Sequence, residues 1–305
     1  MGAFLGSQYK RKDFWLSQRY RGVILVLIAT FLFSIHDTSS KFLTAHYAAA
    51  QIVWMRYLCQ FTLVLLIAAP GRWCEITMTR RPLLTILRGT LQGCSSLFVV
   101  TALSTLPLAE TTSMVFISPL LVALFAGPIL GEKVSRRQWL LIVTGFCGVL
   151  LIARPGGAVF GVGMLYALAC AVCYALYQVL TRKLTATEPP LRLLFYNGLL
   201  GTLVTSLLVP SCWSNVVPTL PQASIILSLG VYGCIGHFMI IRAFSETPAS
   251  ILSPLLYSQL VWSTLLGWQI FGHFPDLLTL LGMLIIGGSS LSLALKQAGT
   301  NQRAR

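Results

Sequence analysis

Charged residues are scarce in this chain, and acidic residues are the scarcest of them. Of its 305 residues only 10% are charged, and 8 Asp and Glu stand against 22 Lys and Arg, whereas about 25% of residues are charged in typical soluble domains. Asp37 alone among the acidic residues lies deep inside a long apolar run. A membrane enzyme acting on a lipid or prenyl substrate would need acidic or His residues clustered near one face, for instance an aspartate-rich metal site. That alternative is therefore weak, and we expect neither a metal site nor a cofactor.

Sequence signatures of catalysis are missing as well. The chain contains no G-x-S-x-G, H-E-x-x-H or Walker motif, so neither a nucleophile elbow nor a zinc protease or nucleotide site is predicted. Its eight cysteines do not suggest a disulfide framework, because most of them fall within apolar runs. Cys170 and Cys173 form a lone C-x-x-C pair in mid-run, where helix packing by small residues is favoured over metal or redox chemistry. Without a nucleotide site, energy must come from a gradient or from a substrate.

Long apolar runs fill most of the chain, which is 56% hydrophobic. A helix needs about 20 predominantly apolar residues to cross a bilayer. Ten runs reach or approach this length, at residues 22–44, 48–69, 83–105, 109–130, 138–153, 160–181, 191–209, 223–243, 249–271 and 277–295. The loops between them are too short to hold a soluble domain. We therefore predict an all-α integral membrane protein with ten transmembrane helices.

The second half of the sequence repeats the first at one constant spacing. The matches are Leu43-Thr44-Ala45 with Leu184-Thr185-Ala186, Ala102 with Ala243, Ser104 with Ser245, Pro107 with Pro248, and Gly131 with Gly272. Leu- and Ala-rich sequences match themselves by chance, but gap-free matches at Pro, Gly, Thr and Ser make chance the weaker explanation. Five runs lie in each copy, so the second copy must enter the membrane inverted relative to the first. We place the repeats at 22–156 and 157–296, between an N-terminal segment (1–21) and a tail (297–305).

Basic residues give the chain a formal net charge of +14 and gather in alternate loops. They precede the first run or follow the even-numbered runs, at Lys10, Arg11, Lys12, Arg19, Arg21, Arg72, Arg80, Arg81, Lys133, Arg136, Arg137, Arg182, Lys183, Arg192, Arg242, Lys296, Arg303 and Arg305. Arg154 is the clear exception. This positive-inside distribution places both termini in the cytoplasm of a multi-pass protein of the inner (cytoplasmic) membrane. A nucleic-acid surface would instead gather charge in one patch, so no nucleic-acid partner is expected.

Four short motifs stand out in the first repeat, at Ala102–Glu110, Ser118–Leu120, Gly131–Lys133 and Gly145–Gly156. They resemble the EamA domain of the drug/metabolite transporter superfamily, a five-helix unit that usually occurs as two inverted copies. The second repeat is less similar. It has Gly272-His273-Phe274 where the first has Gly-Glu-Lys, and Leu260 in place of Pro119.

Three further segments, Phe33–Lys41, Arg56–Leu58 and Arg88–Gly89, are most similar to the branch that includes S-adenosylmethionine, carnitine and acylated amino-acid transporters. The resemblance implies a secondary transporter whose fifth and tenth helices pack at the periphery. We expect it to move a small amphipathic organic metabolite, such as an amino acid or S-adenosylmethionine, across the cytoplasmic membrane by alternating access. Its expected partners are that small molecule and the lipid bilayer, and it is expected to be a monomer or homodimer.

Polar residues within the runs are candidates for substrate contact, because such groups are costly in lipid. Asp37 and Lys41 are four residues apart and share one helical face. They could form an internal ion pair, or Asp37 could attract a cationic substrate group or exchange a proton. Arg56 in the second run is always charged. It needs a carboxylate such as Glu110, a set of carbonyl groups, or an anionic group of the substrate.

The second repeat should supply the opposite wall of the site. At the repeat spacing, Tyr177, Gln178 and Asn197 correspond to His36, Asp37 and Arg56, so this copy keeps polarity but loses charge. We predict a central cavity lined by the first, third, fourth, sixth, eighth and ninth helices. Its predicted contacts are Asp37, Arg56, Phe116, Tyr177, Gln178, His237, Tyr257 and Gln259, with Lys41 and Glu110 as groups for coupling or charge pairing. Pro119 and Pro254 should kink the fourth and ninth helices.

Overall fold

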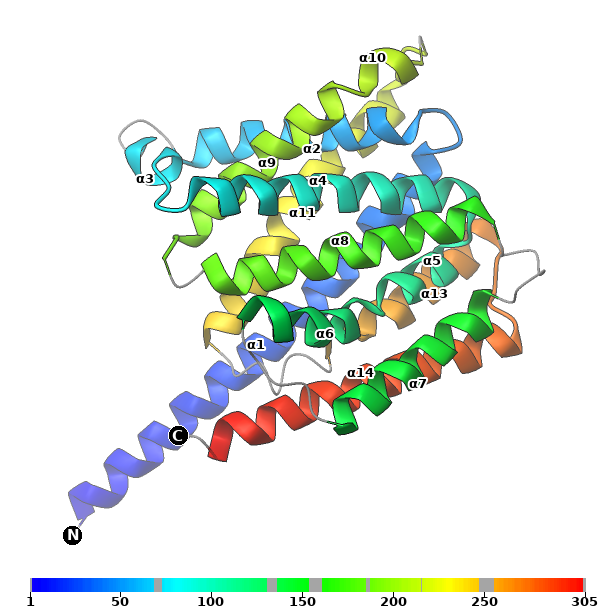
Figure 1. Ribbon diagram of the computed structural model, residues 1–305. Coiled ribbons are helices and arrows are strands. Elements are labelled where there is room, and N and C mark those ends of the chain that lie inside the picture. Colours follow the sequence, from blue (N-terminus) through cyan, green and yellow to red (C-terminus); the bar gives the residue numbers. More distant parts are fainter. Residues whose placement is uncertain are drawn as a thin grey trace.

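Helices make up the fold throughout the part of the chain that the computed structural model describes (Figure 1), which is residues 2–68, 73–130, 136–153, 161–184, 187–214, 216–246 and 255–303. The helices are α1 (Gly2–Leu43), α2 (Ala49–Ala68), α3 (Trp73–Thr77), α4 (Pro82–Thr105), α5 (Leu108–Val115), α6 (Ser118–Leu130), α7 (Arg136–Ala153), α8 (Val162–Leu184), α9 (Pro190–Ser206), α10 (Val209–Cys212), α11 (Leu220–Glu246), α13 (Ser258–Phe271) and α14 (Leu277–Arg303). A helix satisfies every backbone hydrogen bond within its own segment, which is what hydrocarbon surroundings demand.

Several helices begin or end where the sequence places a helix breaker. Pro82 and Pro190 occupy the first turns of α4 and α9, where a missing N–H group is harmless. Both helices begin one residue before the predicted runs. Gly272 ends α13 in the left-handed region, at a φ of 69°, which glycine adopts without the strain that a Cβ atom would cause.

The predicted fourth run, 109–130, forms two helices rather than one. Helix α5 ends at Val115 and α6 begins at Ser118. Pro119 has no N–H group to bond the Val115 carbonyl, and its ring would clash with that carbonyl in a continuous helix. The kink predicted from Pro119 is therefore present as a break. The second predicted kink, at Pro254, lies outside the described residues.

Five helices among the described residues are individually long and apolar enough to cross a membrane. They are Arg21–Leu43, Ala49–Ile67, Pro82–Thr105, Val162–Leu184 and Leu220–Ile240. Shorter apolar stretches lie at Leu108–Val122, Trp139–Ile152 and Leu277–Ser292. The protein is thus an all-helical membrane protein.

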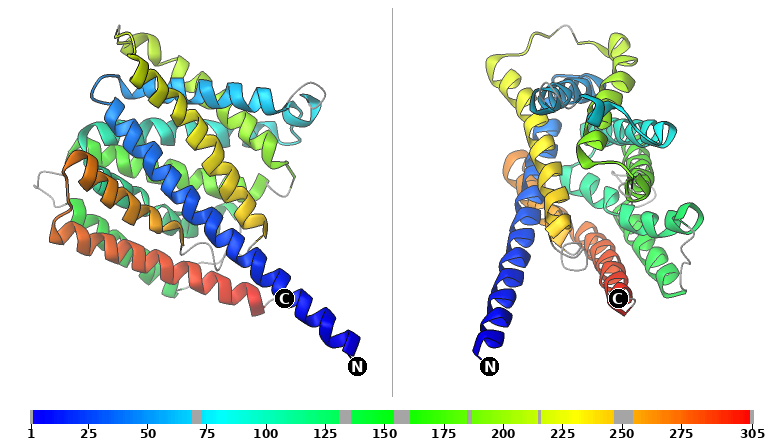
Figure 2. Two further views of the ribbon diagram at one scale, coloured as in Figure 1. Left: turned by 180° about the vertical axis from the view of Figure 1, so that it is seen from behind. Right: turned by 90° about the vertical axis from the view of Figure 1, so that its left-hand side faces the viewer.

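Helix packing follows the repeat seen in the sequence. Helix α1 packs against α11, and its counterpart in the second repeat, α8, packs against α4 (Figure 2). Three other pairs consist of a helix and its own counterpart in the other repeat. They are α2 with α9, α5 with α13, and α7 with α14. A two-fold relation between two five-helix units predicts this set of pairs.

Helices α7 and α14 lie side by side at one side of the bundle (Figure 1). Their contact depends on two glycines. A Cβ atom on Gly282 would lie 2.7 Å from the Gly148 carbonyl oxygen, and one on Gly148 would lie 2.9 Å from the Gly282 carbonyl oxygen. Small residues of this kind let membrane helices approach closely. The placement agrees with the peripheral position implied by the resemblance.

Candidate functional site

A hydrogen-bonded chain joins α2, α1 and α13 inside the bundle. Arg56 NH1 lies 3.0 Å from His36 Nε2, and His36 Nδ1 lies 3.0 Å from Asp37 Oδ1. Gln259 Nε2 donates to Asp37 Oδ2 at 3.2 Å. Because a guanidinium only donates, His36 Nε2 must accept and Nδ1 must carry the proton donated to Asp37. We call Arg56, His36, Asp37 and Gln259 the Arg56 network; within it His36 is neutral.

Lys41 does not pair with Asp37 in this structure. Its Nζ donates to the carbonyl oxygens of Leu103 at 2.9 Å and Leu106 at 2.6 Å, and it lies 5.5 Å from the Phe271 ring centroid. These carbonyls are at the C-terminal end of α4, where helix carbonyls lack partners and the helix dipole attracts a cation. Lys41 therefore caps the C-terminal end of α4 instead of forming the suggested ion pair with Asp37.

Arg56 and Glu110 do not pair either. The Arg56 guanidinium bonds to His36 and lies over the Tyr57 ring, 4.4 Å from its centroid. Glu110 is buried, and its Oε2 atom has no hydrogen-bond partner among the described residues. The charged groups within electrostatic range of Glu110 are Asp276, His273 and Lys41. Glu110 thus belongs with Lys41, apart from the Arg56 network.

Arg88 forms a second network that links α4 to α8 and α9. Its Nε donates to Thr181 Oγ1 at 2.6 Å, and NH2 donates to the Tyr177 hydroxyl at 3.0 Å. NH1 donates to Asn197 Oδ1 at 2.8 Å and to the Leu193 carbonyl at 3.2 Å. The guanidinium also lies 4.5 Å from the Tyr177 ring centroid. We call these residues the Arg88 network; every one of its hydrogen-bond acceptors is neutral.

Sequence reasoning missed Arg88 as a site residue and used it only as part of a family motif. The signal was available, since Arg88 lies within the predicted run 83–105 and an intramembrane arginine demands partners as Arg56 does. The internal repeat also links the two networks. Asn197 Nδ2 donates to the Tyr177 hydroxyl at 3.4 Å, which repeats the contact between Arg56 and His36 at the equivalent positions of the second repeat.

The two networks lie close together. The Tyr57 hydroxyl, on the residue after Arg56, bonds to the Gln92 carbonyl at 3.1 Å and the Ser96 hydroxyl at 2.6 Å, one and two turns beyond Arg88 on α4. His237 on α11 packs on Phe33, with ring centroids 5.1 Å apart. It also lies within electrostatic range of Arg56, His36 and Arg88. Residues from α1, α2, α4, α8 and α11 therefore form one polar region.

The remaining predicted contacts lie around this region. Phe116, at the break between α5 and α6, packs on Tyr257 with ring centroids 5.2 Å apart. Both rings lie against the apolar cluster that includes Met114 and Ile117. Gln178 is half-buried on α8, next to Tyr177. The structure thus links Arg56 to Asp37 through His36 and Asp37 to Gln259, whereas Tyr177 belongs to the neighbouring Arg88 network.

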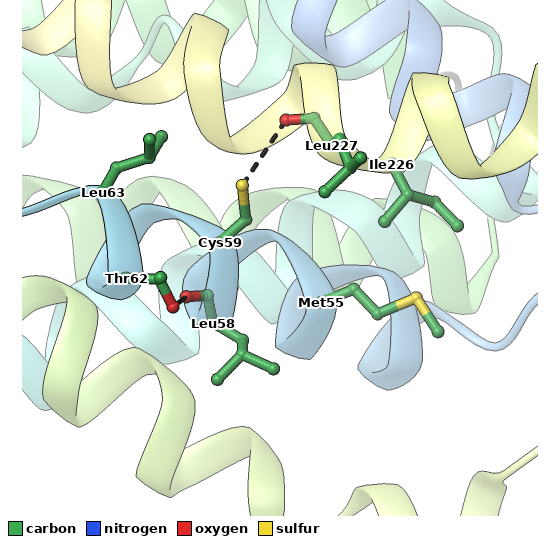
Figure 3. A pocket seen from close by; sticks show the side chains of 7 residues that line it. All are labelled: Met55, Leu58, Cys59, Thr62, Leu63, Ile226 and Leu227. Carbon is green, nitrogen blue, oxygen red and sulfur yellow. Dashed lines mark hydrogen bonds between the residues drawn. The ribbon is translucent and has the colours of Figure 1, made fainter. Parts of the chain in front are cut away.

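An apolar groove of about 370 Å³ lies between α2 and α11 (Figure 3). Its lining residues are Met55, Leu58, Cys59, Thr62, Leu63, Ile226 and Leu227. The two polar side chains are already bonded: Thr62 donates to the Leu58 carbonyl at 2.8 Å, and Cys59 Sγ to the Leu227 carbonyl at 3.6 Å. Leu58 and Leu227 are exposed. The groove suits a hydrocarbon chain and is separate from the polar region.

Glu188 joins two loops at the end of the bundle where α4 begins and α8 ends. It accepts hydrogen bonds from Thr79 Oγ1 at 2.8 Å and from the backbone N–H groups of Arg80 at 2.8 Å and Arg81 at 3.3 Å, and it forms an ion pair with Arg192. Burial alone would raise the pKa of the Glu188 carboxyl. The hydrogen bonds from Arg192, Thr79 and Arg80 outweigh that effect and lower the pKa below its ordinary value.

Glu188→Gln should lower the free energy of unfolding at neutral pH by about 1–3 kcal/mol, because buried donors lose a charged acceptor. A lowered folded-state pKa gives stability that is fully present above the unfolded pKa of about 4.5 and is lost as pH falls through the folded pKa. Melting temperatures measured from neutral pH downward should show the native protein losing its advantage over the variant only at acidic pH. A constant difference across the whole range would contradict this assignment.

Comparison with known proteins identifies the family. A model of the EamA-like transporter family matches residues 20–154 and again 161–295. The two matches are offset from each other by the same spacing that separates Leu43 from Leu184 and Pro107 from Pro248. A solved crystal structure superposes with a TM-score of 0.64 at 20% identity, over 93% of this chain and 98% of that one. The fold is therefore shared with that structure.

Three relatives are transporters. The pseudopaline exporter CntI of Pseudomonas aeruginosa is 30% identical over 283 residues, which cover 91% of this chain and 97% of the exporter. The S-adenosylmethionine uptake transporter of Rickettsia bellii is 27% identical over 266 residues, covering 87% and 90%. A riboflavin transporter of Brucella anthropi is 28% identical over 225 residues, covering 72% and 79%. The chain therefore belongs to the EamA-like transporter family and is a multi-pass membrane secondary transporter rather than an enzyme.

Proposed function

We propose that this transporter moves a small amphipathic organic metabolite, such as an amino acid, S-adenosylmethionine or a related compound, by alternating access. The observation that carries the proposal is the adjacency of the Arg56 and Arg88 networks. They place side chains from both repeats in one buried polar region. Inverted-repeat transporters bind their substrates where the repeats meet, and buried ionisable groups in a membrane protein mark such pathways.

The proposed substrate contacts combine charge with aromatic surface. They are Asp37, Arg56, Phe116, Tyr177, Gln178, His237, Tyr257 and Gln259. A mixed lining of this kind fits an amphipathic organic molecule better than a bare ion. The relatives include an S-adenosylmethionine uptake transporter and a pseudopaline exporter, which supports the same range of organic metabolites.

The proposed orientation places both termini in the cytoplasm and the protein in the cytoplasmic membrane, as a monomer or homodimer. The basic residues of alternate loops support this orientation through the positive-inside rule. We assign residues 22–156 to the first repeat and 157–296 to the second. Their odd number of spans gives the two repeats opposite directions.

A binding screen followed by transport tests the proposed function. Amino acids, S-adenosylmethionine, acetylcarnitine and riboflavin are added to the purified protein, and a ligand that binds the folded state raises its melting temperature. That compound should then enter proteoliposomes containing the protein and not empty liposomes.

Tyr257→Ala should weaken the binding of that compound about tenfold, since the ring supplies apolar contact area. Tyr196→Ala is the matched control, because the Tyr196 hydroxyl bonds the Thr77 carbonyl away from the site. Equal affinity of the native protein and the Tyr257 variant in calorimetry would remove Tyr257 from the site.

A further inference from the structure

The donor groups of Arg56 are only partly used. Arg56 is 9% exposed, and its Nε atom is buried without a hydrogen-bond partner among the described residues. Its hydrogen bond to His36 uses NH1. Leaving a charged donor unpaired in the interior is energetically costly. The native protein therefore carries a buried guanidinium whose Nε group lacks an acceptor among the described residues.

The two networks together carry a net positive charge. His36 is neutral, so Asp37 is the single carboxylate that compensates the two guanidiniums of Arg56 and Arg88 within these networks. Glu110 does not serve them, because the charged groups in its range are Asp276, His273 and Lys41. Among the described residues of the two networks one positive charge remains uncompensated, and a buried unpaired charge is strongly unfavourable.

Arg56 and Arg88 differ in how many of their donor nitrogens already have a protein acceptor. Nε and both terminal nitrogens of Arg88 are engaged by protein acceptors, from Thr181, Leu193, Asn197 and Tyr177. These bonds hold Arg88 in place, so it contributes its charge to the region. Among the described residues Arg56 bonds to His36 through NH1 and stacks on the Tyr57 ring, and its Nε side forms a free edge. A guanidinium edge matches the two oxygens of a carboxylate in a paired geometry.

We propose that the free edge of Arg56 binds a carboxylate group of the transported substrate, with Arg88 contributing the second positive charge. The substrate class is thus an organic carboxylate. The inference rests on the proposed transport function and specifies its substrate. Asp37, with a side chain 19% exposed, holds His36 and Arg56 in position at the other end of the chain of hydrogen bonds.

Pairs of probes, one with a free carboxylate and one without it, test this inference. Acetylcarnitine is compared with acetylcholine, and methionine with its methyl ester, by the shift in melting temperature of the purified full-length protein. At least one acid should raise the melting temperature, and its partner without the free carboxylate should not. If none of the acids shifts the melting temperature, or if each acid and its partner shift it equally, the inference is overturned.

Variants of Arg56 separate recognition from folding. Arg56→Lys keeps the charge but loses the fork, so binding of the acid should weaken about tenfold. Arg56→Gln should weaken it about 100-fold. In the absence of probe Arg56→Lys should melt close to the native protein, which shows that the loss is one of binding. Arg192→Gln, which alters the distant Glu188 ion pair, is the matched control and should keep the native affinity. Unchanged affinity in both Arg56 variants would also overturn the inference.

The transport assay distinguishes the two proposals. Entry of riboflavin or acetylcholine into proteoliposomes, with no response to any acid, would overturn the carboxylate site and leave the transport function standing. Arg56-dependent binding of an acid that never crosses the liposome membrane would leave the carboxylate site standing and count against the proposed function.

Discussion

Asp37→Asn should lower both the yield of folded protein and the rate of transport, the latter by at least about tenfold. Asn keeps the shape of the side chain and can still accept from His36, so the change isolates the negative charge. That charge is the one that balances Arg56 and Arg88 within the two networks. Removing it leaves two buried cations together, a situation worth about 3–5 kcal/mol of instability in buried pairs.

Proteoliposomes at two pH values provide the measurement for Asp37. The probe is the carboxylate that raises the melting temperature most. Two quantities are measured with it: its exchange across the liposome membrane at equal concentrations on both sides, and its accumulation when a gradient is applied. We expect the residual transport of the variant to keep the pH dependence of the native protein, because Asp37 is engaged in charge compensation. If the variant exchanges the probe at the native rate but no longer accumulates it when a gradient is applied, Asp37 would instead be the carrier of a coupled proton. Glu188→Gln, which removes a carboxylate outside the site, is the matched control for transport and should keep the native rate per folded protein.

Arg88→Met should be strongly destabilising. It removes the donor shared by Thr181, Tyr177 and Asn197, and with it these hydrogen bonds from α4 to α8 and α9. Each buried acceptor that loses its donor costs about 1–3 kcal/mol, and the loss of several together should lower the melting temperature by roughly 10 °C. Relief of the desolvated charge offsets part of this, but several acceptors lose their donor at once.

Arg88→Lys serves as the control for Arg88. Lys restores one charge and up to three hydrogen bonds, so it should recover part of the lost melting temperature. Thermal unfolding in detergent measures both variants under the same conditions. A melting temperature of Arg88→Met equal to that of the native protein would show that the network contributes no net stability, and that Arg88 matters through its charge alone.

The sequence by itself determined the spans and the repeat, because both are properties of consecutive residues. The apolar length of the third run, 83–105, predicts α4 at Pro82–Thr105 to within one residue. Pro119 predicts a kink in the fourth run, since its missing N–H group acts on a carbonyl four residues earlier, and the structure has a break after Val115 at that place. The family motifs likewise depend on local order in the chain, and the family they resemble is confirmed.

Only the tertiary structure decided which partner each buried charge takes. Lys41 and Asp37 share a helical face, yet Lys41 reaches the end of α4 and Asp37 reaches His36 and Gln259. The reason is that unpaired carbonyls at a helix end become available to a lysine only when packing fixes the register of the two helices. For the same reason the Arg88 network went unrecognised. Its acceptors come from α8 and α9, about 90–110 residues further along the chain, and no local pattern encodes that distance.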